Sequence, residues 1–264
     1  MLKIKYTFCM LLFAAVLFSA CNKEGFSDNT DEKCKIVTVK RTSGKYVDNA
    51  SITYDSKGDI ASLVSSQDSA FRSFVVKKEP NKIILVTKYD GNYVYDLDGN
   101  NRVIKATIGD WGGKFEFTYS ANGYISSMVQ SFSNWPVPTN FNFYYSDGNL
   151  VKVTFSESIG GYTTNTEIIY TYLKTEMAAL LIEETDPLSF VGSYGYQPLL
   201  LGFYGKTNKN LMESAKVTRV GSTGYVESNY TSYVYKKDAK GNINSVDITR
   251  SGFLTNYSFI YNCN

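Results

Sequence analysis

A repeated pattern of tyrosine and glycine constrains the fold of this chain more than any other feature. After each aromatic-rich run comes a tight turn with glycine, and an apolar residue stands five positions after all five glycines and two positions after four of them. The copies are Tyr54/Gly58, Tyr95/Gly99, Tyr119/Gly123, Tyr145/Gly148 and Tyr235/Gly241. Because glycine, with Asn or Asp before it, adopts positive φ at little cost, each copy predicts a β-hairpin turn.

Aromatic residues alternate with other residues before these turns. Such a period of two is typical of a strand with one buried face. The alternating sets are Tyr93/Tyr95, Phe115/Phe117/Tyr119, Phe141/Phe143/Tyr145 and Tyr233/Tyr235, while Ile168/Tyr170/Tyr172 and Tyr257/Phe259/Tyr261 repeat the pattern without the glycine turn. The second and fifth positions after the glycine are three residues apart, so in a regular strand their side chains would point to opposite faces (opposite parity). Either the turn includes the second position or a bulge follows it.

The spacing of the turns predicts a mainly β fold. Gly99, Gly123 and Gly148 are separated by 24 and 25 residues, which is the length of two strands and two connections. We interpret residues 35–172 as an antiparallel meander of about eleven or twelve strands and residues 215–263 as about four more. Because neighbouring strands twist against each other, the sheet is expected to coil into a trough, an open barrel or a closed barrel.

Residues 173–214 interrupt the strand pattern. Leu173, Met177, Leu180 and Leu181 have helical spacing, and Asp186-Pro187 follows as a stop signal. The pattern predicts one helix near 174–184 that lies across the sheet. An insert of this length in a meander is either a plug that closes an open edge or a functional loop.

The N-terminus has the pattern of a lipoprotein export signal. Lys3 and Lys5 precede an apolar segment, and Ser19-Ala20 stands directly before Cys21. We predict a signal peptide over 1–20, lipidation of Cys21, a flexible polar tether over 21–33, and a single domain over 34–264. An ordinary secretion signal with an incidental cysteine is the alternative.

Two cysteines remain in the folded part, Cys34 and Cys263, close to its two ends. In an oxidising compartment a bond between them would persist. The sequence leaves two interpretations open, a disulfide bond and two separate buried thiols.

The Tyr-x-x-x-Gly-x-[Ile/Leu] units resemble YD repeats of the RHS type. The chain is more similar still to a family of Bacteroidetes lipoproteins of unknown function, through the signal, the hairpin units, and the segment Gly205-Lys206-Thr207-Asn208-Lys209-Asn210-Leu211. The resemblance implies a β-repeat fold and an envelope location. Large RHS shells have many more units than this chain, so the resemblance implies no encapsulating shell and no catalytic residue.

Few residues suggest chemistry. The chain has no histidine, which excludes Ser-His-Asp and Cys-His catalysis and every histidine-ligated metal site. Asp96-Leu97-Asp98-Gly99-Asn100 has the wrong spacing for a calcium loop, so a hairpin turn is the expected reading. Glu116 and Glu167 lie on the polar face of alternating strands and are expected to be solvated. We predict no catalytic residue, no metal site and no cofactor.

Aromatic residues outside the alternating strands are the better candidates for a binding site. Exposed Trp and Tyr rings suit stacking on sugars or on a protein partner. The candidates are Trp111, Trp135, Tyr194, Tyr196, Phe203 and Tyr204. The alternative is that each tryptophan caps one end of the sheet as part of the core.

These features predict a non-catalytic, lipid-anchored outer-membrane lipoprotein, on the periplasmic face or the cell surface. Its predicted partners are the membrane, through the lipid, and a glycan or another surface protein. The basic residues are scattered, and removal of the signal leaves as many basic as acidic residues, so nucleic acid is not expected. The alternatives are a carrier with an apolar ligand in the concave sheet and a glycan hydrolase that uses two carboxylates.

Overall fold

A computed structural model describes residues 34–67, 73–88, 91–109, 112–133, 137–177, 180, 182–190 and 202–263. The chain divides into two compact units, and the unit Lys35–Asn262 contains nearly all of the described residues. The described residues of the other unit are Cys34 and Cys263.

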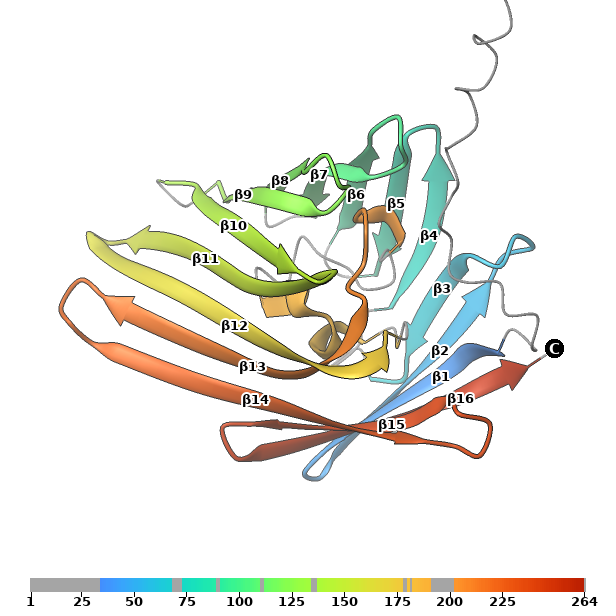
Figure 1. Cartoon of the computed structure of the whole chain (residues 1–264). Helices are drawn as coiled ribbons and strands as arrows, with labels where there is room; N and C mark the ends of the chain where they lie inside the picture. The colour runs from blue at the N-terminus through green and yellow to red at the C-terminus, as the bar shows by residue number, and fades with distance from the viewer. Residues whose placement is uncertain are drawn as a thin grey trace, which may run out of the picture. The chain divides into compact units, whose positions relative to one another are not determined.

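The unit Lys35–Asn262 is a closed antiparallel barrel in which every strand pairs with its neighbours in chain order and β1 pairs with β16 (Figure 1). The described strands are β1 (Cys34–Ser43), β2 (Tyr46–Tyr54), β3 (Ile60–Ser65), β4 (Phe74–Glu79), β5 (Lys82–Thr87), β6 (Asn92–Leu97), β7 (Val103–Ile108), β8 (Gly113–Tyr119), β9 (Ile125–Ser131), β10 (Thr139–Ser146), β11 (Asn149–Ile159), β12 (Tyr162–Glu176), β13 (Asn210–Gly221), β14 (Val226–Lys237), β15 (Ile243–Arg250) and β16 (Phe253–Cys263). The predicted mainly β meander is confirmed. The sheet closes fully, so the trough was wrong.

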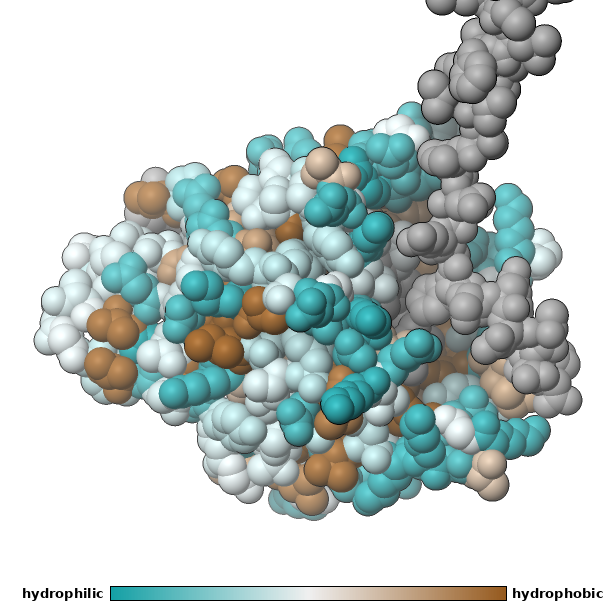
Figure 2. Space-filling model, in the orientation of Figure 1, coloured by the Kyte–Doolittle hydropathy of each residue, from teal (hydrophilic) through white to brown (hydrophobic). Residues whose placement is uncertain are grey.

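The barrel is apolar inside and polar outside. In β8, Phe115 and Phe117 are buried while Lys114 and Glu116 are exposed, and β2 and β10 alternate in the same way. The space-filling view is accordingly hydrophilic over most of its surface, with separate hydrophobic groups (Figure 2). Burial of each large apolar side chain stabilises the barrel by about 1.5–3 kcal/mol, so the interior aromatic residues are its main core.

The insert contains no α-helix among its described residues, and the prediction of a helix near 174–184 was wrong. Strand β12 continues to Glu176, and two short 3₁₀ turns follow, η1 (Glu183–Thr185) and η2 (Pro187–Phe190). Of the apolar residues that suggested a helix, Leu173 lies in β12 and packs against the core, and Leu180 is buried in the core beyond the end of that strand. A helical spacing of four leucine-type residues is too short a signal to distinguish these cases.

The insert lies against the inner face of the barrel. The Tyr170 hydroxyl donates a hydrogen bond of 2.9 Å to the Pro187 carbonyl, and the Tyr204 ring packs edge-on against Phe117 at 5.4 Å between centroids. Strands β8 and β12 thus both contact the insert with inward-facing side chains (Figure 1). The predicted plug that closes an open edge was wrong, because the closed barrel has no open edge; the described residues of the insert instead pack inside the lumen.

The turns at one end of the barrel share one hydrogen-bond pattern, and we call this end the turn end. In turns 55–59, 98–102, 120–124 and 238–242 the first N–H donates to the fifth carbonyl at 2.8 or 2.9 Å. In three of them the side chain of the first residue, an aspartate, also accepts the N–H groups two and four positions on, as Asp238 does from Lys240 and Asn242. This aspartate fixes the turn conformation.

A bulge directly after each of these turns resolves the parity conflict in the repeat. Tyr119 pairs with Ile125, yet Thr118 pairs with Ser127, so Ser126 is the extra residue. Ile125 and Met128 therefore both face the core. The second of the two predicted solutions, a bulge after the second position, is the one observed.

The Tyr95 copy is offset from the other four. Its positive φ of 58° belongs to Asn101, whereas Gly99 is not in the left-handed region. Counted from Asn101, the buried residues at the second and fifth positions are Val103 and Ala106, and Ile104 is exposed. Ile104, the apolar residue five positions after Gly99, therefore faces outward, because Asn101 takes the place of glycine at the turn position that requires positive φ.

Tyrosines at the turn end hydrogen-bond to the backbone of the preceding strand. Each hydroxyl donates to the carbonyl of a residue at the start of that strand, at 2.6–2.9 Å. The pairs are Tyr54–Ile36, Tyr119–Val103, Tyr172–Leu150, Tyr235–Met212 and Tyr261–Ile243. Burial raises the pKa of these tyrosines, that of Tyr261 to about 12, so they remain protonated donors.

Residues 205–210 attach the insert to the turn end. The Lys206 and Lys209 N–H groups donate to the carbonyls of Gly123 and Gly148, each at 2.9 Å. At Gly205, which has φ +76°, a Cβ would overlap the Gly123 carbonyl oxygen. The Gly-Lys-x-x-Lys-Asn-Leu segment thus has a structural role, and the close approach explains its glycine.

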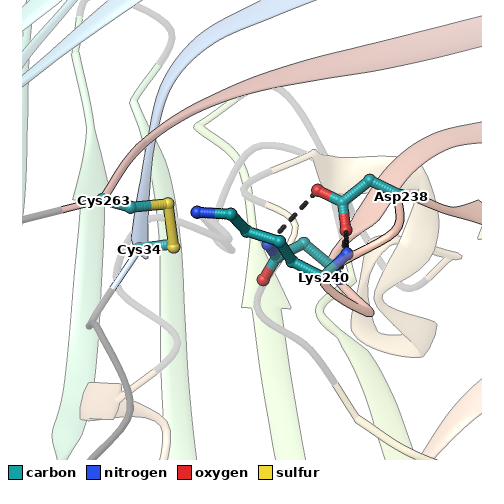
Figure 3. The surroundings of a disulfide bond; sticks show 5 residues. Cys34, Asp238, Lys240 and Cys263 are labelled. Atoms are coloured by element: carbon teal, nitrogen blue, oxygen red, sulfur yellow. Dashed lines mark hydrogen bonds between the residues drawn. A yellow bond between two sulfur atoms is a disulfide. The ribbon is translucent and has the colours of Figure 1, made fainter.

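Cys34 and Cys263 form a disulfide bond in the structure, with their Cα atoms 4.0 Å apart (Figure 3). The bond links the first residue of β1 to the last residue of β16. It therefore joins the two strands that close the barrel.

Candidate functional site

Most of the aromatic residues predicted as ligand contacts lie outside the described residues, as does Cys21. These aromatic residues are Trp111, Trp135, Tyr194 and Tyr196. The other two are described, and they do not form an exposed surface: Tyr204 is buried against Phe117, and Phe203 is half-buried beside the core. The prediction of a ligand contact fails for Tyr204 because its own ring packs against Phe117 inside the barrel.

The glutamates considered for a hydrolase are not brought together. Glu116 faces outward from β8 and Glu167 faces outward from β12, with three strands between them. Glu167 lies 4.0 Å from the Lys152 ammonium on the neighbouring strand. Both are solvated surface carboxylates, as the sequence suggested.

Ion pairs lie on the outer face of several strands and turns. Lys78 of β4 lies 2.6 Å from Asp59 in the turn before β3, and Lys236 of β14 lies 2.8 Å from Asp247 of β15. Such exposed pairs contribute at most about 1 kcal/mol each to stability. Their importance here is chemical, because they make the outward face of many strands charged.

Exposed apolar side chains gather at the end of the barrel opposite the turn end, which we call the hairpin rim. Four hairpins that are consecutive around the barrel carry them at their tips: β1–β2, β15–β16, β13–β14 and β11–β12. The residues are Tyr46, Tyr162, Tyr225, Val226, Phe253 and Leu254, and they are 56–80 % exposed. The hairpins of β11 to β14 form the left edge of the barrel in Figure 1, where Figure 2 also shows hydrophobic groups.

Just inside the hairpin rim the lumen is lined by charged groups. Arg219 of β13 lies 3.7 Å from Glu227 of β14, and both face inward. Burial raises the pKa of Glu157 above its usual value, although the charge of Arg219 opposes this. The inner face therefore changes from apolar aromatic residues at mid-barrel to ionised residues at the rim.

A cavity of about 300 Å³ opens near the tip of the β15–β16 hairpin, between another set of charged residues. We call it the mouth cavity. Its lining is Arg41, Glu184, Ile248, Arg250, Ser251, Phe253, Thr255 and Tyr257. The lining comes from β1, β15 and β16 together with η1 of the insert, so the closure of the barrel and the insert both build this site.

A chain of hydrogen bonds crosses the mouth cavity. Arg41 Nε donates to the Tyr257 hydroxyl at 3.1 Å, and that hydroxyl donates to Glu184 Oε1. Burial, followed by the charge of Glu184, raises the pKa of Tyr257 far above its ordinary value, so this phenol keeps its proton. The arrangement presents one guanidinium, one phenol and one carboxylate in fixed positions.

Sequence reasoning did not find the mouth cavity. Arg41, Glu184 and Arg250 are separated by long stretches of chain, and none belongs to a motif. The available signal was parity: Arg41 and Arg250 stand in phase with the buried residues Val39 and Ile248 of their own strands. Charged residues in the buried phase of a strand mark such a site.

A second hollow, of about 510 Å³, lies on the outer face over β10 to β13. Two cross-strand rows of side chains form it, Asn140–Ser156–Asn165–Val220 and Asn142–Thr154–Glu167–Thr218. Neutral amides and hydroxyls predominate in both rows. Its described lining holds one charged residue, Glu167, whereas the mouth cavity holds Arg41, Glu184 and Arg250, so we take the mouth cavity as the candidate site.

Within the described ranges no group of three or more acidic or cysteine side chains is placed to hold a metal ion. In the same residues, no helix has the length and apolar character needed to cross a bilayer.

Comparison with known proteins identifies a similar fold. No protein-family model and no curated protein matches the chain. A porin-like protein from Bacteroides vulgatus ATCC 8482 aligns with a TM-score of 0.59 and 14 % identity, over 86 % of this chain and 98 % of that chain. A porin-like protein from Bacteroides uniformis ATCC 8492 aligns with a TM-score of 0.56 and 14 % identity, over 86 % and 96 %. At this identity the likeness concerns the fold alone.

Proposed function

We propose that this protein is a lipid-anchored envelope lipoprotein whose barrel is a non-catalytic recognition scaffold, and that it binds a glycan or a surface protein at the hairpin rim. The observation that supports this most is the gathering of exposed apolar side chains on four consecutive hairpins at one end. Rings such as those of Tyr46 and Phe253 provide flat contact surfaces at low entropic cost.

The topology supports the orientation of this scaffold. Strand β1 starts and β16 ends at the turn end, so the chain segment from Cys21 reaches the barrel at that end. A lipid on Cys21 would hold the turn end toward the membrane. The hairpin rim would then face away from the membrane, toward partners.

The outer face favours a barrel held beside the membrane over one inserted in it. A membrane-spanning barrel presents an apolar band to lipid, and a charged side chain there costs about 2–4 kcal/mol at the midplane. Strand β8 instead presents Lys114, Glu116 and Thr118 to the outside, and pairs such as Lys236–Asp247 continue this charged surface. The core side chains and the insert occupy the lumen where a channel would be.

Fractionation tests the anchor. In a bacterium that processes lipoproteins, the full chain should be found in the membrane fraction and the Cys21→Ala variant in the soluble fraction. A Cys21→Ala protein that stays in the membrane after alkaline washing would mean that the barrel itself inserts, and would overturn the anchored arrangement.

Binding of the mature chain from residue 22 to a glycan array and to a panel of purified envelope proteins tests recognition. The rim variant carries Tyr46→Ser, Tyr162→Ser, Tyr225→Ser and Phe253→Ser. The control carries serine at Val64, Val75, Ile104 and Ile260, which are exposed on the side of the barrel. The proposal requires that the rim variant loses binding and the control keeps it. Equal binding by both variants, or absence of any binder, would overturn it.

The carrier of an apolar ligand is not favoured, because the mouth cavity is lined by two arginines and a glutamate.

A further inference from the structure

The mouth cavity has a cationic wall formed by two guanidinium groups. Arg41 and Arg250 both line it, and no described carboxylate lies within ion-pair distance of either. Asp48 pairs with Arg41 in the strand ladder, yet its carboxylate accepts hydrogen bonds from the hydroxyls of Ser65 and Ser66. Arg250 lies over the Phe190 ring at 5.4 Å, an interaction that positions its charge without neutralising it.

The rest of the cavity supplies groups of other kinds. Glu184 is the one acidic residue among the described residues of the lining, and it accepts a hydrogen bond from the Tyr257 hydroxyl. Ser251 and Thr255 contribute hydroxyls, and the Phe253 ring stands at the entrance, 80 % exposed. The cavity therefore combines cations, a strong acceptor, hydroxyls and one aromatic face.

A buried polar atom lies beside this cavity. The Tyr233 hydroxyl is buried, and no described residue or other group hydrogen-bonds to it. Tyr233 pairs with Ile248, a lining residue, and the charges of Arg250 and Glu184 act on its phenol. Buried hydroxyls are normally satisfied, so this phenol is a polar group near the cavity that has no described partner.

From this arrangement we infer that the mouth cavity binds the carboxylate of an acidic sugar unit in a glycan. The two guanidiniums match a carboxylate in charge and in hydrogen-bond geometry. The sugar hydroxyls would donate to Glu184 and exchange hydrogen bonds with Ser251 and Thr255. Its apolar ring face would pack on Phe253.

The volume of the mouth cavity and its acceptor group, Glu184, favour an acidic sugar over other anions. About 300 Å³ is at the lower limit of ordinary ligand sites, roughly 300–1,000 Å³, which suits a single ring rather than an extended segment. Glu184 would repel a dianionic phosphate or sulfate more strongly than a carboxylate with one charge, and it complements the hydroxyl groups of a sugar. A peptide C-terminus shares the carboxylate but provides few hydroxyl donors. The inference depends on the proposed recognition function and specifies its ligand.

Calorimetric titration of the mature chain from residue 22 tests the inference. The probes are oligogalacturonate and its neutral methyl ester, sialyllactose and lactose, and a short peptide with a free or an amidated C-terminus. At least one acidic sugar should bind at least tenfold more tightly than its neutral counterpart. Failure of every acidic sugar to bind, or equal binding of the neutral forms, would overturn the inference, as would preference for the free peptide.

Three variants locate the binding. Arg41→Gln and Arg250→Gln should each lower the affinity for the acidic sugar at least tenfold. Both variants should still unfold cooperatively on heating. Lys40→Gln is the matched control, because Lys40 is exposed on the outer face next to Arg41 in sequence. Phe253 is exposed and does not support the core, and Phe253→Ser should lower the affinity for both acidic and neutral sugars. Unchanged binding in the arginine variants would overturn the inference.

Failure of the acidic-sugar inference can be distinguished from failure of the proposed recognition function. If the arginine variants bind as the wild type while the rim variant does not, recognition at the hairpin rim stands and the acidic-sugar site is wrong. If the rim variant and its control bind alike, the recognition proposal itself fails.

Discussion

The Tyr119 hydroxyl donates a hydrogen bond of 2.6 Å to the carbonyl of Val103, which lies on the preceding strand. Val103 stands where the strand register shifts after a turn, and such a bulge leaves a backbone group unpaired in the ladder. The phenol of the next strand supplies the missing partner. Turn, bulge and tyrosine thus form one unit, which explains why they recur together in the sequence.

Replacement of this tyrosine by phenylalanine tests the unit. Tyr119→Phe keeps the ring that lies 4.4 Å from the Arg102 guanidinium, but it leaves the Val103 carbonyl without its donor. The free energy of unfolding should fall by about 1–3 kcal/mol in urea titration. Tyr144→Phe, on the exposed outer face, is the control and should change it by less than about 0.5 kcal/mol. Equal effects in the two variants would contradict this account.

Asp98 should make stability depend on pH. Partial burial opposes its ionisation, but hydrogen bonds from the Arg102 side chain and backbone outweigh this and keep the pKa of Asp98 below its usual value. A carboxyl whose pKa is lower in the folded state stabilises the fold above its unfolded pKa, near 4, and loses that contribution as pH falls through the folded pKa.

The Asp98→Asn variant isolates this effect. Urea unfolding at pH 6 should show the variant less stable than the wild type, and the difference should shrink at pH 3. Because Asp98 is 19 % exposed, solvent screening limits the difference at pH 6 to about 1 kcal/mol. A difference that is constant with pH would mean that the charge of Asp98 contributes nothing.

The sequence predicts the strands and their order well because the signal is local. Alternation within each strand and a turn residue between strands determine both the inward face and the antiparallel pairing, as in β8 and β9. The helix near 174–184 failed because the partners of that segment are distant in the sequence: Glu176 pairs with Asn210 of β13, and Leu180 and Ile182 pack in the core of the barrel. The mouth cavity was missed for the same reason, since Arg41 and Glu184 meet only after the barrel closes around the insert.

The offset of the Tyr95 copy yields a prediction opposite to the one that the sequence pattern alone would give. Gly99 has no heavy atom within 4 Å of an added Cβ and no positive φ, so Gly99→Ala should change the free energy of unfolding by less than about 0.5 kcal/mol. Asn101 has a φ of 58°, and Asn101→Ala should cost about 1 kcal/mol, because a left-handed conformation is costly for alanine. Thermal unfolding of both variants provides the comparison. A larger loss at Gly99 would mean that the turn is centred on the glycine.

The barrel closes where β1 pairs with β16, and we call this pairing the seam. Among the interactions at the seam, the disulfide between Cys34 and Cys263 should contribute most to stability. The bond closes a loop with a sequence separation of 229, for which loop-closure entropy gives at most about 5 kcal/mol. The seam is also held by Arg41–Tyr257 and Thr255–Ser43 hydrogen bonds, so a chain without the bond should still fold. We expect the double variant Cys34→Ser/Cys263→Ser to lose about 2–5 kcal/mol in urea and to exchange the amides of β1 and β16 faster than those of β8. A reductant should lower the free energy of unfolding of the wild type to that of the variant, and it should leave that of the variant unchanged. If the reductant has no effect on the wild type, strand pairing alone closes the barrel.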